Sequence, residues 1–438
     1  MSKGKSITLL SILSVIVALV MVLTFARFPV GTIKTYNSAL RAIELDYDIE
    51  GGVAYTLTLA PDNENEVKDN IDDVVETIEY RLDALGYSVF SVKALMSTEE
   101  GVEDYDIRIE AKNTETLASD IQAIAAYGEV EFLGGAEENP TSEILSDMKV
   151  IEDAKYVGMY EDGNYVISIE FTKEAKDALV ELIEAQDSYY LKINCGETAN
   201  GEENTLFNSS ISANAFDGNF LGISGIPSEE DANRLVLQIK SGGLAYKYEL
   251  SEAVEVGSPY GENIGAKCAI AVAALVVVIM VALILIYKGF GIISAISTLL
   301  FILIEIWMMI AVPGIVLSLG GVIGIVLATI LAAYGMIVTC SRVKEEYAYS
   351  EKTVKAAINK GFNQSLIPVI GAHIISGVIA LCLLAFTSGA LKCFAITFGI
   401  GAGVSLIATL VFTRMFTALI LPLAKDKEKF LNMKKAEV

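Results

Sequence analysis

The stretch Cys268–Ile286, CAIAVAALVVVIMVALILI, contains no charged residue and decides the fold class. A helix of this length can cross the roughly 30 Å hydrocarbon core of a bilayer. Similar stretches follow it towards the C-terminus, and another lies alone near the N-terminus. They are Ile7–Phe25, Gly289–Ala311, Ile315–Cys340, Ser365–Thr387 and Cys393–Leu421. The sequence therefore predicts a polytopic α-helical membrane protein with six spans and one large loop between the first two.

The charge of the chain is distributed asymmetrically. Residues 31–262 hold 48 acidic and 15 basic residues, a net charge of −33, whereas the rest of the chain carries +10 and the whole chain −23. The basic residues outside the loop gather at Lys3 and Lys5, at Lys288, from Arg342 to Lys360, and from Lys425 to Lys435. Six crossings place all these clusters on one side of the membrane, which the positive-inside rule identifies as the cytoplasm. We therefore expect both termini in the cytoplasm and residues 29–264 outside the cell.

The first span could be a signal peptide or an uncleaved anchor. The residues after it, Phe25-Ala26-Arg27-Phe28-Pro29, make a poor cleavage site because the small-x-small pattern is missing. The anchor is therefore the favoured interpretation.

Composition and motifs exclude several function classes. An acidic ectodomain repels phosphates, so no nucleic-acid partner is expected. The negative charge suits basic, cationic or unfolded partners, but on charge alone simple solubility is the favoured explanation. Cys195 is the single cysteine of the ectodomain, so neither an internal disulfide nor a metal site is expected. No P-loop, nucleophile elbow or zinc spacing occurs, which indicates a protein without enzymatic activity and without a cofactor.

The ectodomain pattern alternates between strand and helix signals. The first half reads as β-α-β-β-α-β, which is typical of a ferredoxin-like unit. The expected elements are Gly52–Leu59, a helix over Glu64–Leu85 capped by Asn63, Tyr87–Val92, Tyr105–Ala111, a helix over Glu115–Ala126, and Glu129–Leu133.

A second region begins after Gly134-Gly135. The pattern there predicts a strand at Tyr165–Glu170, a helix over Lys173–Ala185, a loop-rich stretch from Asn194 to Asn219, a strand at Ile223–Ile226 and a helix over Glu229–Ser241. The expected domains are an anchor (1–28), a ferredoxin-like base (29–134), a head (135–220), a return segment to the base (221–264), a five-helix transmembrane domain (265–424) and a basic cytoplasmic tail (425–438).

Several short motifs follow one another along the chain. They comprise Asp48, Gly51 and Gly52 after the first span, Gly321 and Gly324 in the fourth span, Arg342 and Lys344 at the exit of that span, Gly389, Lys392 and Phe394 where the fifth span leads into the sixth, and Arg414 near the end of the sixth. The segments Tyr80–Gly86, Ile223–Ala232 and Ser241–Leu244 complete the set. In this order the motifs resemble SecD, a subunit of the accessory Sec protein-export complex within the RND superfamily, and the resemblance covers residues 1 to about 425.

The chain departs from the family where proton coupling is expected. The fourth span of the family carries an intramembrane Asp within a Val-Asp-Ala-Asn run. Here Tyr334 occupies the Asp position and Met336 the Asn position, while Glu50 replaces the Arg of the first motif. The sequence thus indicates a divergent SecD-like chain whose membrane relay is lost or rewired.

Three intramembrane residues remain as proton-relay candidates. A relay needs a titratable group that faces the bundle, and Glu305, His373 and Tyr334 are the candidates in spans three, five and four. Glu305 and His373 differ in depth by roughly 12 Å, so a Tyr334–His373 hydrogen bond is easier to form than a Glu305–His373 pair. The alternative interpretation is that Glu305 is neutral or paired with another subunit and that His373 is a packed, hydrogen-bonded group. Arg414 fits a snorkelling anchor, and Gly399, Gly401 and Gly403 fit close helix packing.

The resemblance implies a six-helix RND-like half-bundle with an α+β ectodomain that holds an exported polypeptide outside the plasma membrane of a bacterium. It also implies a SecF-like membrane subunit and the Sec translocation channel as partners, besides unfolded exported polypeptides and membrane lipid. Two alternatives stay open. An RND-type transporter of lipids or small molecules predicts an apolar cleft in the ectodomain. A non-coupled scaffold subunit predicts that Glu305 and His373 can be replaced without loss of function.

Overall fold

The computed structural model describes residues 3–30, 34–59, 71–99, 102–146, 149–159, 165–186, 188–197, 203–241, 244, 247–312, 315–349 and 353–435. The chain forms two compact units. One comprises Met1–Glu50 and Gly257–Val438, and the other Gly51–Val256.

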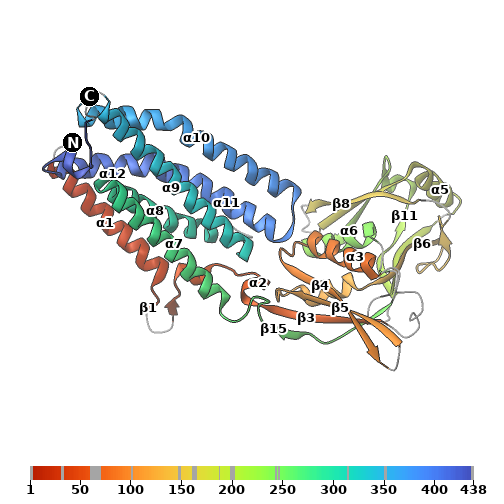
Figure 1. Ribbon diagram of the computed structural model, residues 1–438. Coiled ribbons are helices and arrows are strands. Elements are labelled where there is room, and N and C mark those ends of the chain that lie inside the picture. Colours follow the sequence, from red (N-terminus) through yellow and green to blue (C-terminus); the bar gives the residue numbers. More distant parts are fainter. Residues whose placement is uncertain are drawn as a thin grey trace. The chain divides into compact units, whose positions relative to one another are not determined.

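The first unit is a bundle of long apolar helices (Figure 1). The bundle comprises α1 Lys3–Phe25, α7 Ile264–Tyr287, α8 Gly289–Ala311, α9 Leu319–Ala348, α10 Val354–Phe386, and α11 Gly389–Ile407, which continues through the π-helical turn Ala408–Phe412 into α12 Thr413–Ile420. Within the described residues, six helices are long and apolar enough to cross a membrane, which confirms the six predicted spans. The start of α1 and the end of α12 lie at the same end of the bundle (Figure 1), as an even number of crossings requires.

The helices differ in how deeply they lie in the bundle. α8, α9 and the α11–α12 span bury about half of their residues, whereas α1, α7 and α10 bury less than a fifth. Small residues allow this close packing, because a Cβ atom added to Gly324 of α9 would lie 2.8 Å from the carbonyl oxygen of Phe394 on α11. Many of the hydroxyls in the interior donate to carbonyls of their own helices, as Thr329 does to Ile325.

The second unit contains a base sheet with the strand order β14-β3-β5-β4. Its elements are β3 Gly52–Leu59, α3 Ile71–Ala84, β4 Phe90–Glu99, β5 Val102–Ala111, α4 Leu117–Ile124, β14 Tyr248–Leu250, and β15 Val254–Val256, which also pairs with β3. All the pairings are antiparallel, so the topology is ferredoxin-like, as predicted. The part of the predicted first helix before Ile71, including its cap Asn63, lies outside the described residues.

The prediction that residues 129–133 close this unit is wrong. They form part of β6, Tyr127–Gly135, which pairs with another sheet, whereas β14 occupies the edge position beside β3. Phe132 and Leu191 pack together in the core of that other sheet, which explains why β6 belongs to it. The base is therefore closed by a strand that lies far along the chain.

The rest of the second unit holds two further sheets, ordered β11-β10-β6-β7 and β12-β13-β9-β8. Their elements are β7 Glu143–Ile144, β8 Ile151–Met159, β9 Tyr165–Phe171, α5 Lys173–Glu184, β10 Tyr189–Glu197, β11 Glu203–Ile211, β12 Phe216–Asp217, β13 Phe220–Ile226 and α6 Glu229–Ser241. The helices α5 and α6 match their predicted ranges, and both bury apolar residues in the shared core.

The prediction of loops between Asn194 and Asn219 is wrong for much of that stretch. β10 and β11 form a hairpin whose register runs from Tyr189↔Ile211 to Glu197↔Glu203. β11 buries only Leu206 and Ile211 among its side chains. Backbone pairing with β10, and not an apolar pattern, therefore forms this strand, which explains why its sequence resembles a loop.

Candidate functional site

Glu305 lies on α8 and is completely buried inside the membrane unit. Neither of its carboxylate oxygens has a hydrogen-bond partner in the part of the chain that the structure describes. A carboxylate in hydrocarbon is costly, and an unpaired one more so. Glu305 is thus an isolated acid in a bundle whose other buried polar groups are mostly hydroxyls.

Small residues form the surroundings of the Glu305 carboxyl. A Cβ atom added to Gly401 of α11 would contact both a carboxylate oxygen of Glu305 and the Cβ atom of Ala328 on α9. The carboxyl therefore lies where α8, α9 and α11 meet, in space that only glycine leaves free. The prediction that Gly401 serves close helix packing agrees with this arrangement.

His373 lies on α10 and is 5% exposed. Its Nδ1 atom lies 2.7 Å from the carbonyl oxygen of Val369, and its Nε2 atom lies 2.9 Å from the hydroxyl of Ser405 on α11. Because a carbonyl oxygen only accepts, Nδ1 carries a proton. A neutral ring accepts from Ser405 at Nε2; a protonated ring donates to Ser405, whose own proton then turns to the carbonyl of Ala402, 2.9 Å away. The site accommodates either protonation state.

Tyr334 does not join the other two candidates. Its side chain is 43% exposed on the surface of the bundle. Both nitrogens of the His373 ring already contact other groups, so the hydrogen bond expected between Tyr334 and His373 is not formed. The structure places Glu305 and His373 against the same helix, α11, and leaves Tyr334 outside.

A π-helical turn interrupts the last span at Ala408–Phe412. The backbone N–H of Thr413 donates to the carbonyl of Ala408, five residues earlier, as a π-helical turn requires, and the Thr413 hydroxyl donates to the same carbonyl at 3.1 Å. The buried hydroxyl of Thr409 has no partner among the described residues, and it lies opposite Gly335 on α9. Such turns are frequent at functional sites. The sequence contains no signal for this one.

Asp48, in the segment between α1 and the ectodomain, makes two hydrogen bonds with residues of the membrane unit. Its Oδ2 atom accepts a hydrogen bond of 2.7 Å from the backbone N–H of Leu319, the first residue of α9. Its own carbonyl accepts a bond of 2.6 Å from Ser258, just before α7. Burial raises the pKa of the Asp48 carboxyl. The motif residue thus acts as a helix cap, a role that its sequence alone does not show.

The motif glycines meet backbone constraints. Gly51 (φ 91°) and Gly389 (φ 60°) adopt left-handed conformations that favour glycine. A Cβ atom on Gly52 would contact the backbone of Ala111 on β5, and one on Gly321 would lie 3.3 Å from a methyl group of Thr397. These residues therefore serve turns and close packing.

Three motif cations, Arg342, Lys344 and Arg414, lie near the ends of α9 and α12. The fourth, Lys392, lies in the first turn of α11. Arg342 pairs with Glu345 at 2.8 Å, and both side chains are about half exposed. Lys344 lies 4.6 Å above the ring of Tyr287, and Arg414 lies 5.9 Å from the ring of Phe362. Phe394 stacks on Phe398 with ring centroids 5.5 Å apart. The environment of Arg414 fits the anchoring role that the sequence favoured.

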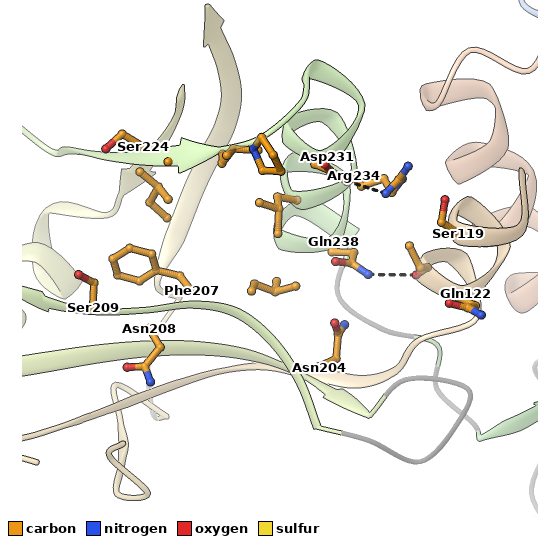
Figure 2. A pocket seen from close by; sticks show the side chains of 17 residues that line it. Ser119, Gln122, Asn204, Phe207, Asn208, Ser209, Ser224, Asp231, Arg234 and Gln238 are labelled. Carbon is orange, nitrogen blue, oxygen red and sulfur yellow. Dashed lines mark hydrogen bonds and ion pairs between the residues drawn. The ribbon is translucent and has the colours of Figure 1, made fainter. Parts of the chain in front are cut away.

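A cleft of about 660 Å³ opens in the ectodomain (Figure 2). It is bounded by β11, by β13 with the turn after it, and by the helices α4 and α6. Most of its polar lining consists of amides and hydroxyls, at Ser119, Gln122, Asn204, Asn208, Ser209, Ser224 and Gln238. Sequence reasoning missed this cleft, because β11 was expected to be loop.

A charged network holds the helices at one end of the cleft. Arg234 of α6 donates to Asp120 of α4 at 2.6 Å and to Asp231 at 2.7 Å. The hydroxyl of Tyr87 donates to the other Asp120 oxygen at 2.6 Å, and burial together with this bond raises the pKa of Tyr87 to about 12. Figure 2 shows Asp231 and Arg234 side by side next to Ser119.

A buried arginine of α3 forms hydrogen bonds with the ends of α4 and α6. Arg81 of α3 is 1% exposed and donates to the carbonyl of Ile124 at 2.6 Å and to the hydroxyl of Ser241 at 3.1 Å. Burial lowers the pKa of this guanidinium to about 10. Within the described ranges, no group of His, Cys, Asp or Glu gathers in a way that could hold a metal ion.

Known proteins resemble this chain over different lengths. A family described as "protein export membrane protein SecD/SecF, C-terminal" matches residues 239–421. Protein translocase subunit SecD of Salmonella choleraesuis is 32% identical over 204 residues, which are 46% of this chain and 33% of that protein. The match thus spans only about a third of that relative. Protein translocase subunit SecD of Sebaldella termitidis is 23% identical over 398 residues, 90% of this chain and 94% of that one.

The fold is also known from a solved structure. The crystal structure of SecDF in its "Super-membrane-facing form" superimposes with a TM-score of 0.70 at 21% identity, over 94% of this chain and 57% of that chain. At this identity the likeness concerns the fold. Taken together, the family match over residues 239–421, the long relative and the six apolar helices show a multi-pass membrane protein that is similar to SecD proteins.

Proposed function

We propose that this chain is an accessory subunit of protein export whose ectodomain holds an emerging polypeptide and whose membrane unit responds to the proton gradient through Glu305. One observation carries the coupling: a fully buried acid with neither oxygen hydrogen-bonded among the described residues. A group of this kind changes its interactions greatly when it gains or loses a proton.

The arrangement of the membrane helices supports this coupling. Glu305 faces α9 and α11, so its charge state bears on the packing of the deepest helices in the bundle. His373 contacts α11 at Ser405 and can exist in both protonation states there. A proton moving between these groups would need bridging water or a partner subunit, because their depths differ by roughly 12 Å. We therefore assign proton binding to Glu305, with His373 as a second group on the same helix.

The proposal includes orientation, partners and domain roles. The basic clusters support cytoplasmic termini and an extracellular location for residues 29–264. The relatives' printed names support association with a Sec translocase, and SecDF carries SecD-like and SecF-like parts, so we propose a SecF-like partner subunit. The exposed apolar side chains of α10, such as Ile374 and Val378, are available for helix or lipid contacts.

A complementation assay in the source cell tests the proposal. A deletion strain receives the wild-type chain, Glu305→Gln, His373→Ala or Tyr334→Asp, and secretion of a reporter protein is followed before and after a protonophore collapses the gradient. We expect Glu305→Gln to abolish the gradient-dependent part of export while the protein remains folded, because the amide has nearly the shape of the acid. Glu345→Gln, at the exposed end of α9, is the matched control.

Each outcome discriminates between functions. Normal export by all the variants would contradict coupling and favour the non-coupled subunit. The exposed position of Tyr334, away from the other two relay candidates, also supports that alternative. Unchanged export in the deletion strain would contradict the export function itself. The ectodomain cleft is lined by amides and hydroxyls together with apolar side chains, among them Leu206, Phe207 and Ile226, so the lipid-transporter alternative stays open.

A further inference from the structure

The ectodomain cleft lies against the edges of two β-strands, and not over their faces. Successive side chains of a strand point to opposite faces, so a cavity over one face touches every second residue. This cleft touches the consecutive residues Leu206–Ser209 on β11 and Ile223–Ile226 on β13. Figure 2 shows the two strands on opposite sides of the cleft. The backbone edges therefore form two of its walls.

Among the described residues, neither edge has a strand partner along the cleft. In the part of the chain that the structure describes, β11 is the last strand of its sheet and pairs with β10. β13 pairs with β9, and β12 covers only Phe220 and Leu221 on its other side. Among the described residues, no strand covers β13 from Gly222 onwards. An uncovered edge presents unpaired N–H and C=O groups, which form a template for another extended chain.

The side chains that face the cleft favour recognition independent of sequence. The amides of Gln122, Asn204, Asn208 and Gln238 line it, and an amide both donates and accepts, as a peptide group does. The charged lining residues, Asp231 and Arg234, neutralise each other at 2.7 Å. The guanidinium of Arg234 also forms an ion pair of 2.6 Å with the carboxylate of Asp120. The cleft thus offers hydrogen bonds to a peptide backbone, apolar contacts to Phe207 and Leu235, and a lining whose two charged residues cancel each other.

We propose that this cleft binds an extended, unfolded polypeptide as an added strand on the edge of β11, with β13 as the opposite wall. The inference rests on the proposed export function and assigns the polypeptide to a defined site. Strand addition obtains affinity from main-chain hydrogen bonds, so it suits a site that must accept many sequences. The segment Asn204–Ser209 can pair with about six residues of an extended chain, since each residue adds about 3.4 Å.

The sheet that contains β13 offers a matched control. Its opposite end is β8, which is also an edge strand, and Val157 of β8 is 55% exposed. Val157 does not line the cleft. Any polypeptide that adheres to exposed strand edges in general would reach Val157 as readily as Asn208. Binding at the cleft alone distinguishes the proposed site from such adhesion.

The first experiment places a photoreactive p-benzoylphenylalanine at Asn208, Ser224 or Val157 of the full chain in the source cell. A secreted reporter is arrested during export, and cross-links between it and this chain are detected after illumination. We expect cross-links from Asn208 and Ser224 and none from Val157. If export needs this chain but Asn208 and Ser224 form no cross-links, the cleft proposal fails and the proposed function stands. If deletion of the chain leaves export unchanged, the proposed function fails.

The second experiment tests the hydrogen bonds themselves and needs no variant that might misfold. The full chain in lipid nanodiscs is titrated with a fluorescent unfolded peptide and with the same peptide N-methylated at every second residue. N-methylation removes the N–H donors of one edge while the side chains stay the same. We expect the methylated peptide to bind about tenfold or more weakly, because several main-chain hydrogen bonds are lost. Equal affinity for the two peptides would overturn strand addition.

Discussion

At the scale of single residues, the environment of Glu305 depends on the absence of a side chain at Gly401. An added methyl group would contact the carboxylate and Ala328 together. We expect Gly401→Ala to lower the free energy of unfolding by about 1–3 kcal/mol, the usual effect of overpacking. Thermal unfolding in nanodiscs measures this change. Gly403→Ala is the matched control on the same helix, because a Cβ atom there meets nothing within 4 Å. Equal stability of the two variants would contradict the tight packing around Glu305.

Tyr87 provides a pH-dependent test of the network beside the cleft. Burial and the bond to Asp120 raise its pKa from 10.0 to about 12. The folded state therefore keeps this proton when the unfolded chain has lost it, so the free energy of unfolding falls as the pH rises from 10 to 12. Tyr87→Phe removes that contribution, which amounts to about 2.7 kcal/mol for a shift of two units. Chemical unfolding followed by circular dichroism at several pH values compares the two proteins, and identical slopes between pH 10 and 12 would contradict the assignment.

The sequence identifies the types of the candidate groups but not their contacts. Hydropathy makes Glu305 and His373 conspicuous, because titratable side chains are rare in membrane spans. Whether such a side chain faces the bundle depends on tertiary packing, and Tyr334, the third relay candidate, lies on the surface of the bundle. Likewise, Ser405 carries no sequence signal that connects it with His373, 32 residues away along the chain.

At the scale of elements, the side chain of Asp48 connects the segment that leads into the ectodomain with the membrane helix α9. The Asp48 carboxylate accepts from the first N–H group of α9, and burial raises the pKa of that carboxyl. The hydrogen-bond acceptor at Asp48 therefore contributes more to the stability of α9 than the negative charge of the carboxylate does. We expect Asp48→Ala to destabilise the membrane unit by about 1 kcal/mol, as the loss of a helix cap does, and Asp48→Asn to stay near the wild type. Thermal unfolding in nanodiscs measures both, with the exposed Glu50→Ala as control. A loss with Asn as large as that with Ala would show that the charge is essential.

Elements with a strong local pattern were predicted well, and elements defined by distant pairing were not. The boundaries of α6 and α8 agree with the sequence, because a helix makes its hydrogen bonds locally. The strand that closes the base, β14, comes more than a hundred residues after β5, and no periodicity links the two. β11 is polar on most of its length and depends on β10. Pairing over such distances is a property of the whole chain.

At the scale of the whole molecule, the charge distribution predicts the orientation in the membrane. The acidic loop and the basic helix ends have opposite net charges, and only basic residues near spans are retained in the cytoplasm. A cysteine introduced at Glu252, which is exposed between β14 and β15, should therefore react with a membrane-impermeant thiol reagent in intact cells. A cysteine at Lys355, which is exposed near the start of α10, should react only after the membrane is opened.

The same labelling experiment separates this orientation from its reverse. The unmodified chain serves as the blank, since four of its cysteines lie in membrane helices and the fifth, Cys195, is buried. An inverted chain would exchange the two results, with Lys355→Cys reactive in intact cells. It would also place the cleft and the polypeptide site in the cytoplasm, where a chain emerging from the channel could not reach them. Labelling of Glu252→Cys alone in intact cells is therefore required both by the positive-inside rule and by the proposed holding of exported polypeptides.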